Sequence, residues 1–402
     1  MADWGVSTPL SGVVGRDGMR RPTSRAQCHN SLPTGDKALE SAMGGWPVEN
    51  AIRVEVQAVV GMDLGDRSSQ LCRLDRETGA ILEERRLSTT SASFQGYFTG
   101  ANRCLVVVES GTHTPWVRRL LESLGHQVIT ANPSKVRAIA SSRQKTDERD
   151  ARCLAQLARV DPELLSPVHA RSEQSQQALA VVRAREGLVK ARTMLINQVR
   201  GTVKSFGARL PGCSAKSFAR RVAQALPKEL KAALEPLLAV IADLSERIRS
   251  FERDIEAWAQ RFPATQRLRQ VKGVGALTAL VYMLTLDDPY RFARSRTVGA
   301  YLGLVPASRS SGQCSPQLPI TKQGDRLLRR LLVQAAHYVL GPFGQESDLR
   351  RFGLELSRRG GKNGKKRAVV AVARKLAVLL HRLWISGEQY EPCRQPAVTV
   401  AA

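Results

Sequence analysis

The chain has 402 residues, of which 43% are hydrophobic and 24% are charged, a balance that is typical of folded domains and excludes wholesale disorder. Lys and Arg total 61 against 36 Asp and Glu, which gives a formal net charge of +25. Such an excess favours a polyanionic partner, nucleic acid before an anionic membrane surface. No apolar run approaches the roughly 18 residues that a membrane span needs. The seven cysteines stand singly, so we expect reduced thiols, a cytoplasmic location and no membrane partner.

The sequence pattern changes four times along the chain. Residues 1–52 are rich in Gly, Pro and Ser and lack periodicity, which predicts a disordered extension. Residues 53–170 alternate strand-like and helix-like runs, whereas residues 171–264 and 265–386 have the spacing of helices. The tail, residues 387–402, carries two prolines, and we expect it to be disordered.

The predicted fold class is α/β followed by α. Residues 53–170 predict three strands in antiparallel succession, then a fourth strand, a helix, a fifth strand and a helix. The fourth strand, "RCLVVVES", is continuously apolar, as a buried central strand should be. This order matches a ribonuclease-H-like (RuvC-like) fold. The next stretch predicts two long antiparallel helices, which either pair with another copy or form an ordinary bundle, and a mostly helical C-terminal unit follows.

Four acids of the α/β stretch could converge. Asp63 lies near the end of the first strand and Glu109 ends the fourth, and these two strands are neighbours in a ribonuclease-H-like sheet. Asp147 and Asp150 share one face of the helix after the fifth strand, because residues three apart are neighbours on a helix. Such a set could hold two divalent cations for chemistry at phosphorus, and an all-oxygen site suits Mg²⁺. The alternative for each acid is a solvated charge or a helix cap, and it weighs most for Asp147 and Asp150.

A serine run forms the second candidate site. Ser310, Ser311 and Gly312 precede a basic helix start, and a serine can attack phosphorus when nearby cations hold the phosphate. The cations here are Lys322, Arg326, Arg329 and Arg330. From the residues alone, an ordinary turn with no catalytic role is the more common interpretation of a Ser-Ser-Gly sequence.

Two further features indicate contacts with phosphate. Gly-Val-Gly at 273–275, beside Lys272, either resembles a helix-hairpin-helix, whose backbone amides bind phosphates, or is a tight helix connection. Between Arg350 and Lys375 there are ten Lys or Arg and one acid, a balance that favours phosphate binding over a solvated face. The candidate contacts in this stretch are Lys362, Lys365, Lys366 and Arg367.

Together these motifs resemble a known family. "GMDLG", "VVVESGTHTPW", "NPSKVRAIASSRQKTDERDA" and "LGLVP…SSG…ITKQGD..LRRLL" follow one another as in the DEDD transposases of the bacterial insertion-sequence one-ten family, relatives of the Piv/MooV invertases. The resemblance covers roughly residues 56 to 385. It departs at "QCSPQLP", residues 313–319, where the family usually carries basic and glycine residues.

The resemblance implies an enzyme of phosphoryl transfer, a transposase and site-specific DNA recombinase active at the nucleoid. It assigns Asp63, Glu109, Asp147 and Asp150 to a Mg²⁺ site. It assigns Ser311, with Ser310 as the adjacent alternative, to a nucleophile that links covalently to DNA. Members use a structured non-coding guide RNA that pairs with donor and target double-stranded DNA. They act as homo-oligomers, dimers or tetramers, in which the acid domain of one protomer meets the serine domain of another.

Two other functions stay open. The acid set alone would suit a RuvC-type metal-dependent nuclease, in which water attacks and the serine has no role. The basic charge alone would suit an inactive copy that binds nucleic acid without cutting it.

Overall fold

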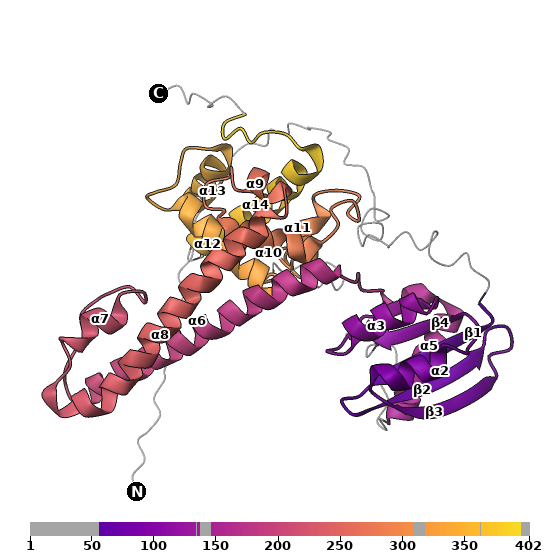
Figure 1. The fold of residues 1–402 in the computed structure, drawn as a ribbon. Helices are drawn as coiled ribbons and strands as arrows, with labels where there is room; N and C mark the ends of the chain where they lie inside the picture. Colours follow the sequence, from indigo (N-terminus) through magenta and orange to yellow (C-terminus); the bar gives the residue numbers. More distant parts are fainter. Residues whose placement is uncertain (1–55, 134, 137–145, 309–317, 362, 395–402) are drawn as a thin grey trace, which may run out of the picture. The chain divides into compact units, whose positions relative to one another are not determined.

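The computed structural model describes residues 56–133, 135–136, 146–308, 318–361 and 363–394 (Figure 1). The predicted disordered extension, residues 1–52, lies outside these ranges. Within them, no helix is both long and apolar enough to cross a membrane. The described part consists of an N-terminal α/β region with a five-stranded sheet and a mostly helical remainder.

The sheet has the strand order β3-β2-β1-β4-β5. The strands are β1 Ala58–Leu64, β2 Ser68–Asp75, β3 Ile81–Ser88, β4 Cys104–Glu109 and β5 Gln127–Ala131. β1 pairs antiparallel with β2 and parallel with β4. β2 and β3 are antiparallel, and β4 and β5 are parallel. The first and fourth strands are therefore neighbours, and both end at the same edge of the sheet.

Helices cover both faces of this sheet. They are α2 Ser91–Phe98, α3 Thr114–Ser123 and α5 Asp147–Val160, and a short 3-10 turn, Pro162–Leu165, follows α5. The even-numbered core residues of β1 and β4 pack with α2 and α3, and the odd-numbered ones pack with α5. This division follows from the alternation of side chains along a strand. The face of β1 that carries Asp63 is therefore the face that α5 covers.

The helix α2 was not predicted, so the observed element order is β-β-β-α-β-α-β-α. It has eight residues, including Gly96, and several are poor helix formers, which leaves a weak sequence signal. Tertiary contacts stabilise it, because Phe94 and Phe98 are buried one turn apart against the sheet. The Thr90 side chain caps its first turn by accepting a hydrogen bond from the Ser93 amide.

Two helices of 33 residues each open the helical remainder, α6 Glu173–Ser205 and α8 Lys228–Gln260. They run antiparallel: the start of α6 packs with the end of α8, and the end of α6 packs with the start of α8. A short helix that was not predicted, α7 Phe218–Ala223, adds Phe218 and Val222 to the second of these clusters. The predicted pairing of these helices with another copy stays a prediction.

The C-terminal helices share one apolar core with the start of α6 and the end of α8. They are α9 Ala264–Leu268, α10 Ala276–Leu286, α11 Thr297–Tyr301, α12 Arg326–Leu340, α13 Asp348–Arg358 and α14 Gly364–Ser386. α10 is central, because every residue from Thr278 to Leu286 is buried. Gly273 and Gly275 connect α9 to α10, and a Cβ atom on Gly273 would lie only 3.2 Å from the Ala335 carbonyl oxygen of α12. Gly273 also has a positive φ of 96°, a backbone conformation that favours glycine at this turn.

The predicted disordered tail begins with residues that the structure describes. Residues 388–394 form neither helix nor strand but contact α13, where the Arg394 amide donates to Asp348 Oδ2 and the Asp348 amide donates to the Pro392 carbonyl. Residues 395–402 lie outside the described ranges.

Candidate active site

Asp63 and Glu109 lie at the ends of adjacent parallel strands. In the register of β1 and β4, Met62 pairs with Val108, so the next position sets Asp63 beside Glu109. Paired residues of parallel strands point to the same face, which here is the face covered by α5. Both carboxylates are partly buried. The strand register thus gives two neighbouring acids at one edge of the sheet.

The helix α5 packs on β1 at Gly61 with no room for a side chain. A Cβ atom on Gly61 would lie 2.0 Å from the Ala151 carbonyl oxygen and 2.5 Å from the Ala155 amide nitrogen. Real Cβ atoms essentially never come within 3.0 Å of a heavy atom outside their own residue and its chain neighbours. Gly61, two residues before Asp63 on the same face of β1, is therefore the residue that lets the helix approach the acids.

The first turn of α5 points toward the Asp63 end of β1. Ala151 lies over Gly61, whereas Ala158, two turns later, packs with Val56 and Val59 at the beginning of β1. The helix therefore runs antiparallel to β1. Arg152 fixes its rotation, since its Nη2 lies 2.8 Å and 3.0 Å from the two carboxylate oxygens of Glu84 on β3. Bidentate pairs of this kind hold orientation as well as position.

Asp147 and Asp150 belong to the face of α5 that turns toward the sheet. Asp147 lies one turn before Ala151 and Asp150 one turn before Leu154, and Ala151 and Leu154 are both buried. Asp150 is partly buried and Asp147 is exposed. Thr146 caps the helix by accepting a hydrogen bond from the Arg149 amide. Acids in a first turn also complement the helix dipole, so that alternative explanation still applies to both.

The donors at this edge suit a hard divalent cation, because all four are carboxylates. The strand register sets Asp63 beside Glu109, and the helix α5, which carries Asp147 and Asp150, packs on the same face of the sheet. Among the residues that the structure describes, no group of three or more Asp, Glu, His or Cys side chains is placed to hold a metal ion. Carboxylates that share a site repel one another unless a cation lies between them. The convergence of the four acids therefore stays a prediction.

Ser310 and Ser311 lie outside the described residues, but the structure defines the base of the loop that carries them. We call residues 308–318 the serine loop, and residues 303–307 with 319–322 its neck. An isolated antiparallel bridge joins Pro306 to Ile320 across the neck. Its backbone hydrogen bonds run from Ala307 N to Pro319 O, from Thr321 N to Val305 O and from Lys322 N to Gly303 O. The two ends of the serine loop are therefore held side by side.

Arg329 and Arg330 have partners inside the chain that the sequence analysis did not foresee. Arg329 Nη1 donates to the Leu302 carbonyl at 2.9 Å and to the Gln323 carbonyl at 2.6 Å, at the two sides of the neck. Arg330 forms an ion pair with Glu186 of α6, a carboxylate that is almost fully buried. The structure thus gives Arg329 a role in fixing the neck and Arg330 a role in joining α12 to α6.

The other predicted phosphate contacts that the structure describes are exposed on the helical remainder: Lys272, Lys322, Arg326, Lys365, Lys366 and Arg367. Lys365, Lys366 and Arg367 occupy the first turn of α14, where the positive end of the helix dipole adds to their charge. Lys322, the last residue of the neck, has a positive φ of 57°. Lys362 lies outside the described residues. Their contact with nucleic acid stays a prediction.

Comparison with known proteins identifies the family. A model of DEDD-type IS110 proteins, described as transposase, matches residues 60–207, and a model described as "Transposase IS116/IS110/IS902 family" matches residues 265–349. The transposase for insertion sequence element IS1111A of Coxiella burnetii is 30% identical over 345 residues, 83% of this chain and 91% of the relative. This chain belongs to the IS110 family of transposases. A probable family 20 transposase of Pseudomonas aeruginosa is 31% identical over 343 residues, 83% of this chain and 98% of the relative.

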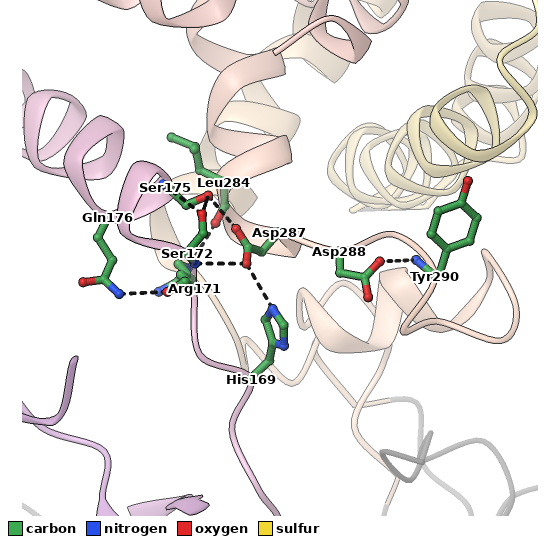
Figure 2. Close-up of polar contacts among 9 residues, drawn as sticks. All are labelled: His169, Arg171, Ser172, Ser175, Gln176, Leu284, Asp287, Asp288 and Tyr290. Carbon is green, nitrogen blue, oxygen red and sulfur yellow. Dashed lines mark hydrogen bonds and ion pairs between the residues drawn. The ribbon is translucent and has the colours of Figure 1, made fainter. Parts of the chain in front are cut away.

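The IS110-family transposase contains one polar cluster that the sequence analysis missed (Figure 2). Asp287, at the end of α10, accepts hydrogen bonds from His169 Nε2 at 3.1 Å, from the Ser172 amide at 3.3 Å and from Ser175 Oγ at 2.5 Å. Beside it, Arg171 Nε donates to the Leu284 carbonyl at 3.0 Å. We call residues 169–175 with Asp287 the clasp. It anchors the segment that leads into α6 to the end of α10, and its two sides are more than 100 residues apart in sequence, which hides it from pattern analysis.

The clasp predicts a pH-dependent contribution to stability. Burial works to raise the pKa of Asp287, but hydrogen bonds from His169, Ser175 and Ser172 outweigh it and lower the pKa below its ordinary value of 3.8. A carboxyl group with a depressed pKa stabilises the fold above its unfolded pKa, and this stability is lost as the pH falls through the folded pKa. Asp287→Ala is expected to destabilise the transposase by roughly 2 kcal/mol at neutral pH. In thermal unfolding scans, the difference in unfolding temperature between Asp287→Ala and the wild type should shrink below pH 3.8.

Asp288→Ala is the matched control, since this neighbouring carboxylate accepts one hydrogen bond, from the Tyr290 amide. It should lower the unfolding temperature less than Asp287→Ala does. Equal effects of the two substitutions, or an Asp287→Ala deficit that persists unchanged in acid, would contradict the assigned role of the clasp.

Proposed function

We propose that this IS110-family transposase cuts and rejoins DNA through a covalent phosphoserine intermediate, with the four acids holding Mg²⁺ beside the reacting phosphate. One observation carries the proposal: the parallel neighbours β1 and β4 carry Asp63 and Glu109 side by side near their C-terminal ends, on the face that α5 covers. The strand order supports a ribonuclease-H-like reading of the α/β region. The family match supports a transposition reaction.

In the proposed reaction the Ser311 oxygen attacks a backbone phosphorus, and the bond between that phosphorus and a sugar oxygen breaks. The serine hydroxyl loses its proton and the departing sugar oxygen gains one, so the DNA strand remains joined to the protein through phosphate. Attack by a sugar hydroxyl of a second strand on this phosphoserine releases the serine and rejoins DNA. Mg²⁺ held by Asp63, Glu109, Asp147 and Asp150 would stabilise the charge that develops on the phosphate oxygens.

The neck of the serine loop contributes geometry to this reaction. Arg329 bonds the carbonyls on both sides of the neck, which fixes the neck relative to α12. Holding a nucleophile in a near-attack position can supply a large part of the rate enhancement. We infer that Arg329 acts on the serine loop as a positioning residue, whereas Lys322 and Arg326 are exposed and available to DNA phosphates.

The nucleic acid partners follow from charge and family resemblance. We propose that the exposed cations of the helical remainder bind the backbone of donor and target DNA and of a structured guide RNA. These cations are Lys272, Lys322, Arg326, Lys365, Lys366 and Arg367. Backbone contacts alone carry no sequence information, so base pairing with the RNA would provide specificity, as in other RNA-guided proteins. We further propose that a homo-oligomer brings the acids of one protomer to the serine loop of another.

Trapping of the protein–DNA adduct tests the nucleophile. Wild-type protein, incubated with Mg²⁺ and duplex DNA carrying an end of its element, should yield a denaturation-resistant adduct that is absent with Ser311→Ala. Ser308→Ala is the matched control, because Ser308 is exposed at the base of the same loop, and it should retain the adduct. If the adduct still forms with Ser311→Ala but is lost with Ser310→Ala, the nucleophile is Ser310. Free 3′-hydroxyl ends without an adduct in the wild type would support the nuclease alternative instead.

A further inference from the structure

Arg291, in the segment between α10 and α11, has a buried guanidinium edge without a hydrogen-bond acceptor. Its Cζ atom lies 4.7 Å from the ring centre of Phe292 and 4.6 Å from that of Tyr301. Its Nε and Nη2 atoms are shielded from solvent and have no partner. These two nitrogens form the edge of the guanidinium that binds two oxygens of one anion side by side. Among the residues that the structure describes, no other arginine has two such nitrogens.

Within the part of the chain that the structure describes, no carboxylate accepts from this edge. A buried donor that lacks an acceptor is destabilising, and aromatic rings stabilise the faces of a guanidinium but not its edge. Asp288, three residues earlier, directs Oδ1 to the Tyr290 amide at 2.9 Å (Figure 2). No Asp or Glu occurs in the sequence between Asp288 and Asp325. The acceptor that the edge requires therefore comes most simply from another molecule.

The segment around Arg291 is firmly held. The His381 ring of α14 contacts the Pro289 carbonyl through Nε2 at 2.9 Å and Ser295 Oγ through Nδ1 at 3.0 Å. The same ring packs edge-on against Phe292, with 5.5 Å between ring centres. Binding groups on a fixed segment lose little conformational entropy when a ligand arrives. Arg291 is thus preorganised, and only its edge is unsatisfied.

The position of Arg291 relates it to the serine loop. Tyr301, which stacks on its guanidinium, ends α11 and directly precedes Leu302, whose carbonyl is bonded by Arg329 at the neck. Tyr301 is 38% exposed, so the aromatic contact lies near the protein surface. We propose that Arg291 binds a backbone phosphate of the DNA strand that the serine loop engages. The assignment to DNA rests on the proposed function, and access to the edge requires the side chains around it to move.

The test is the affinity of the full chain for a synthetic DNA duplex across a series of salt concentrations. Arg291→Met keeps an unbranched side chain against the two rings but removes the donors. We expect it to weaken DNA binding by about tenfold to a hundredfold and to lower the salt slope by about one phosphate contact. Its unfolding temperature should equal or exceed that of the wild type, because unsatisfied donors are removed. Arg291→Lys keeps the charge and should keep the salt slope while losing most of the affinity.

Arg294→Met is the matched control, since it removes the same charge from an exposed position of the same segment. It should weaken binding less than Arg291→Met. The proposal is overturned by wild-type DNA affinity in Arg291→Met, by an equal loss in Arg294→Met, or by a loss confined to RNA of the same sequence. A lowered unfolding temperature with unchanged affinity would show a structural role alone. This assay measures DNA binding and involves no strand cleavage, so failure of the phosphoserine mechanism leaves the result for Arg291 readable.

Discussion

Asp63→Asn is expected to reduce DNA strand cleavage and rejoining by roughly a thousandfold, while DNA affinity and unfolding temperature stay near those of the wild type. The substitution keeps the size of the side chain and removes one negative charge from the edge where β1 and β4 end. A metal ligand that becomes neutral loses most of its attraction for Mg²⁺, and the metal contributes several kcal/mol to stabilisation of the transition state. Cleavage of labelled duplex DNA under single-turnover conditions measures the effect.

Asp66→Asn and Glu148→Gln are the controls for this prediction. Asp66 lies three residues beyond Asp63 with 93% of its side chain exposed, and Glu148 is exposed on the first turn of α5 between the two predicted ligands. Both substitutions remove one negative charge from the same part of the chain and should leave cleavage within a few-fold of the wild type. If all three variants lose the same activity, the loss reflects overall charge and Asp63 has no special role.

Gly61→Ala is expected to destabilise the α/β region by about 3 kcal/mol or more, the upper part of the range for overpacking a filled core. The new Cβ atom would lie 2.0 Å from the Ala151 carbonyl oxygen. The position of the Cβ atom is set by the backbone of residue 61 and the oxygen is itself a backbone atom, so neither can rotate away. The helix α5 must then shift from β1, which also moves Asp147 and Asp150 away from Asp63. Thermal unfolding should show the loss of stability, and the cleavage assay should show a loss of activity.

Gly96→Ala provides the comparison, because a Cβ atom on this glycine of α2 would have nothing within 4 Å. In a helix, Ala is favoured over Gly by roughly 0.5–1 kcal/mol, so this variant should be as stable as the wild type or more so. A Gly61→Ala protein with wild-type unfolding temperature and activity would show that α5 does not pack on β1 as described.

The strands of the α/β region were predictable because each carries its own signal. β1 and β4 are short apolar runs, rich in valine, with an acid near the C-terminal end of each. The phase of α5 was predictable for the same reason, since Asp147 and Asp150 lie one turn before buried residues. The helix α2 was missed because its stability comes from Phe94 and Phe98 packing on the sheet, which no local pattern reveals.

Long-range partners account for the parts of the candidate site that sequence could not supply. Arg330 pairs with Glu186, which lies 144 positions away on α6, so no local pattern reveals this partner. The predicted contact of Arg330 with phosphate stays a prediction. Arg329 was grouped with it by charge, although its bonds to backbone carbonyls depend on the course of the neck. The Gly61 contact was equally hidden, because a glycine in a strand does not disclose which helix will cover it. The charge of a side chain shows that it can form an ion pair or hydrogen bond, but the identity of its partner depends on the fold.

Metal binding itself tests the central claim most directly. Calorimetric titration of the full chain with Mg²⁺, in the presence of duplex DNA carrying an end of its element, should give about two ions per chain for a two-metal carboxylate site. The double variant Asp63→Asn, Glu109→Gln should lose this binding while it retains DNA. Equal uptake of Mg²⁺ by the double variant, or no uptake by the wild type, would contradict the assignment of the four acids.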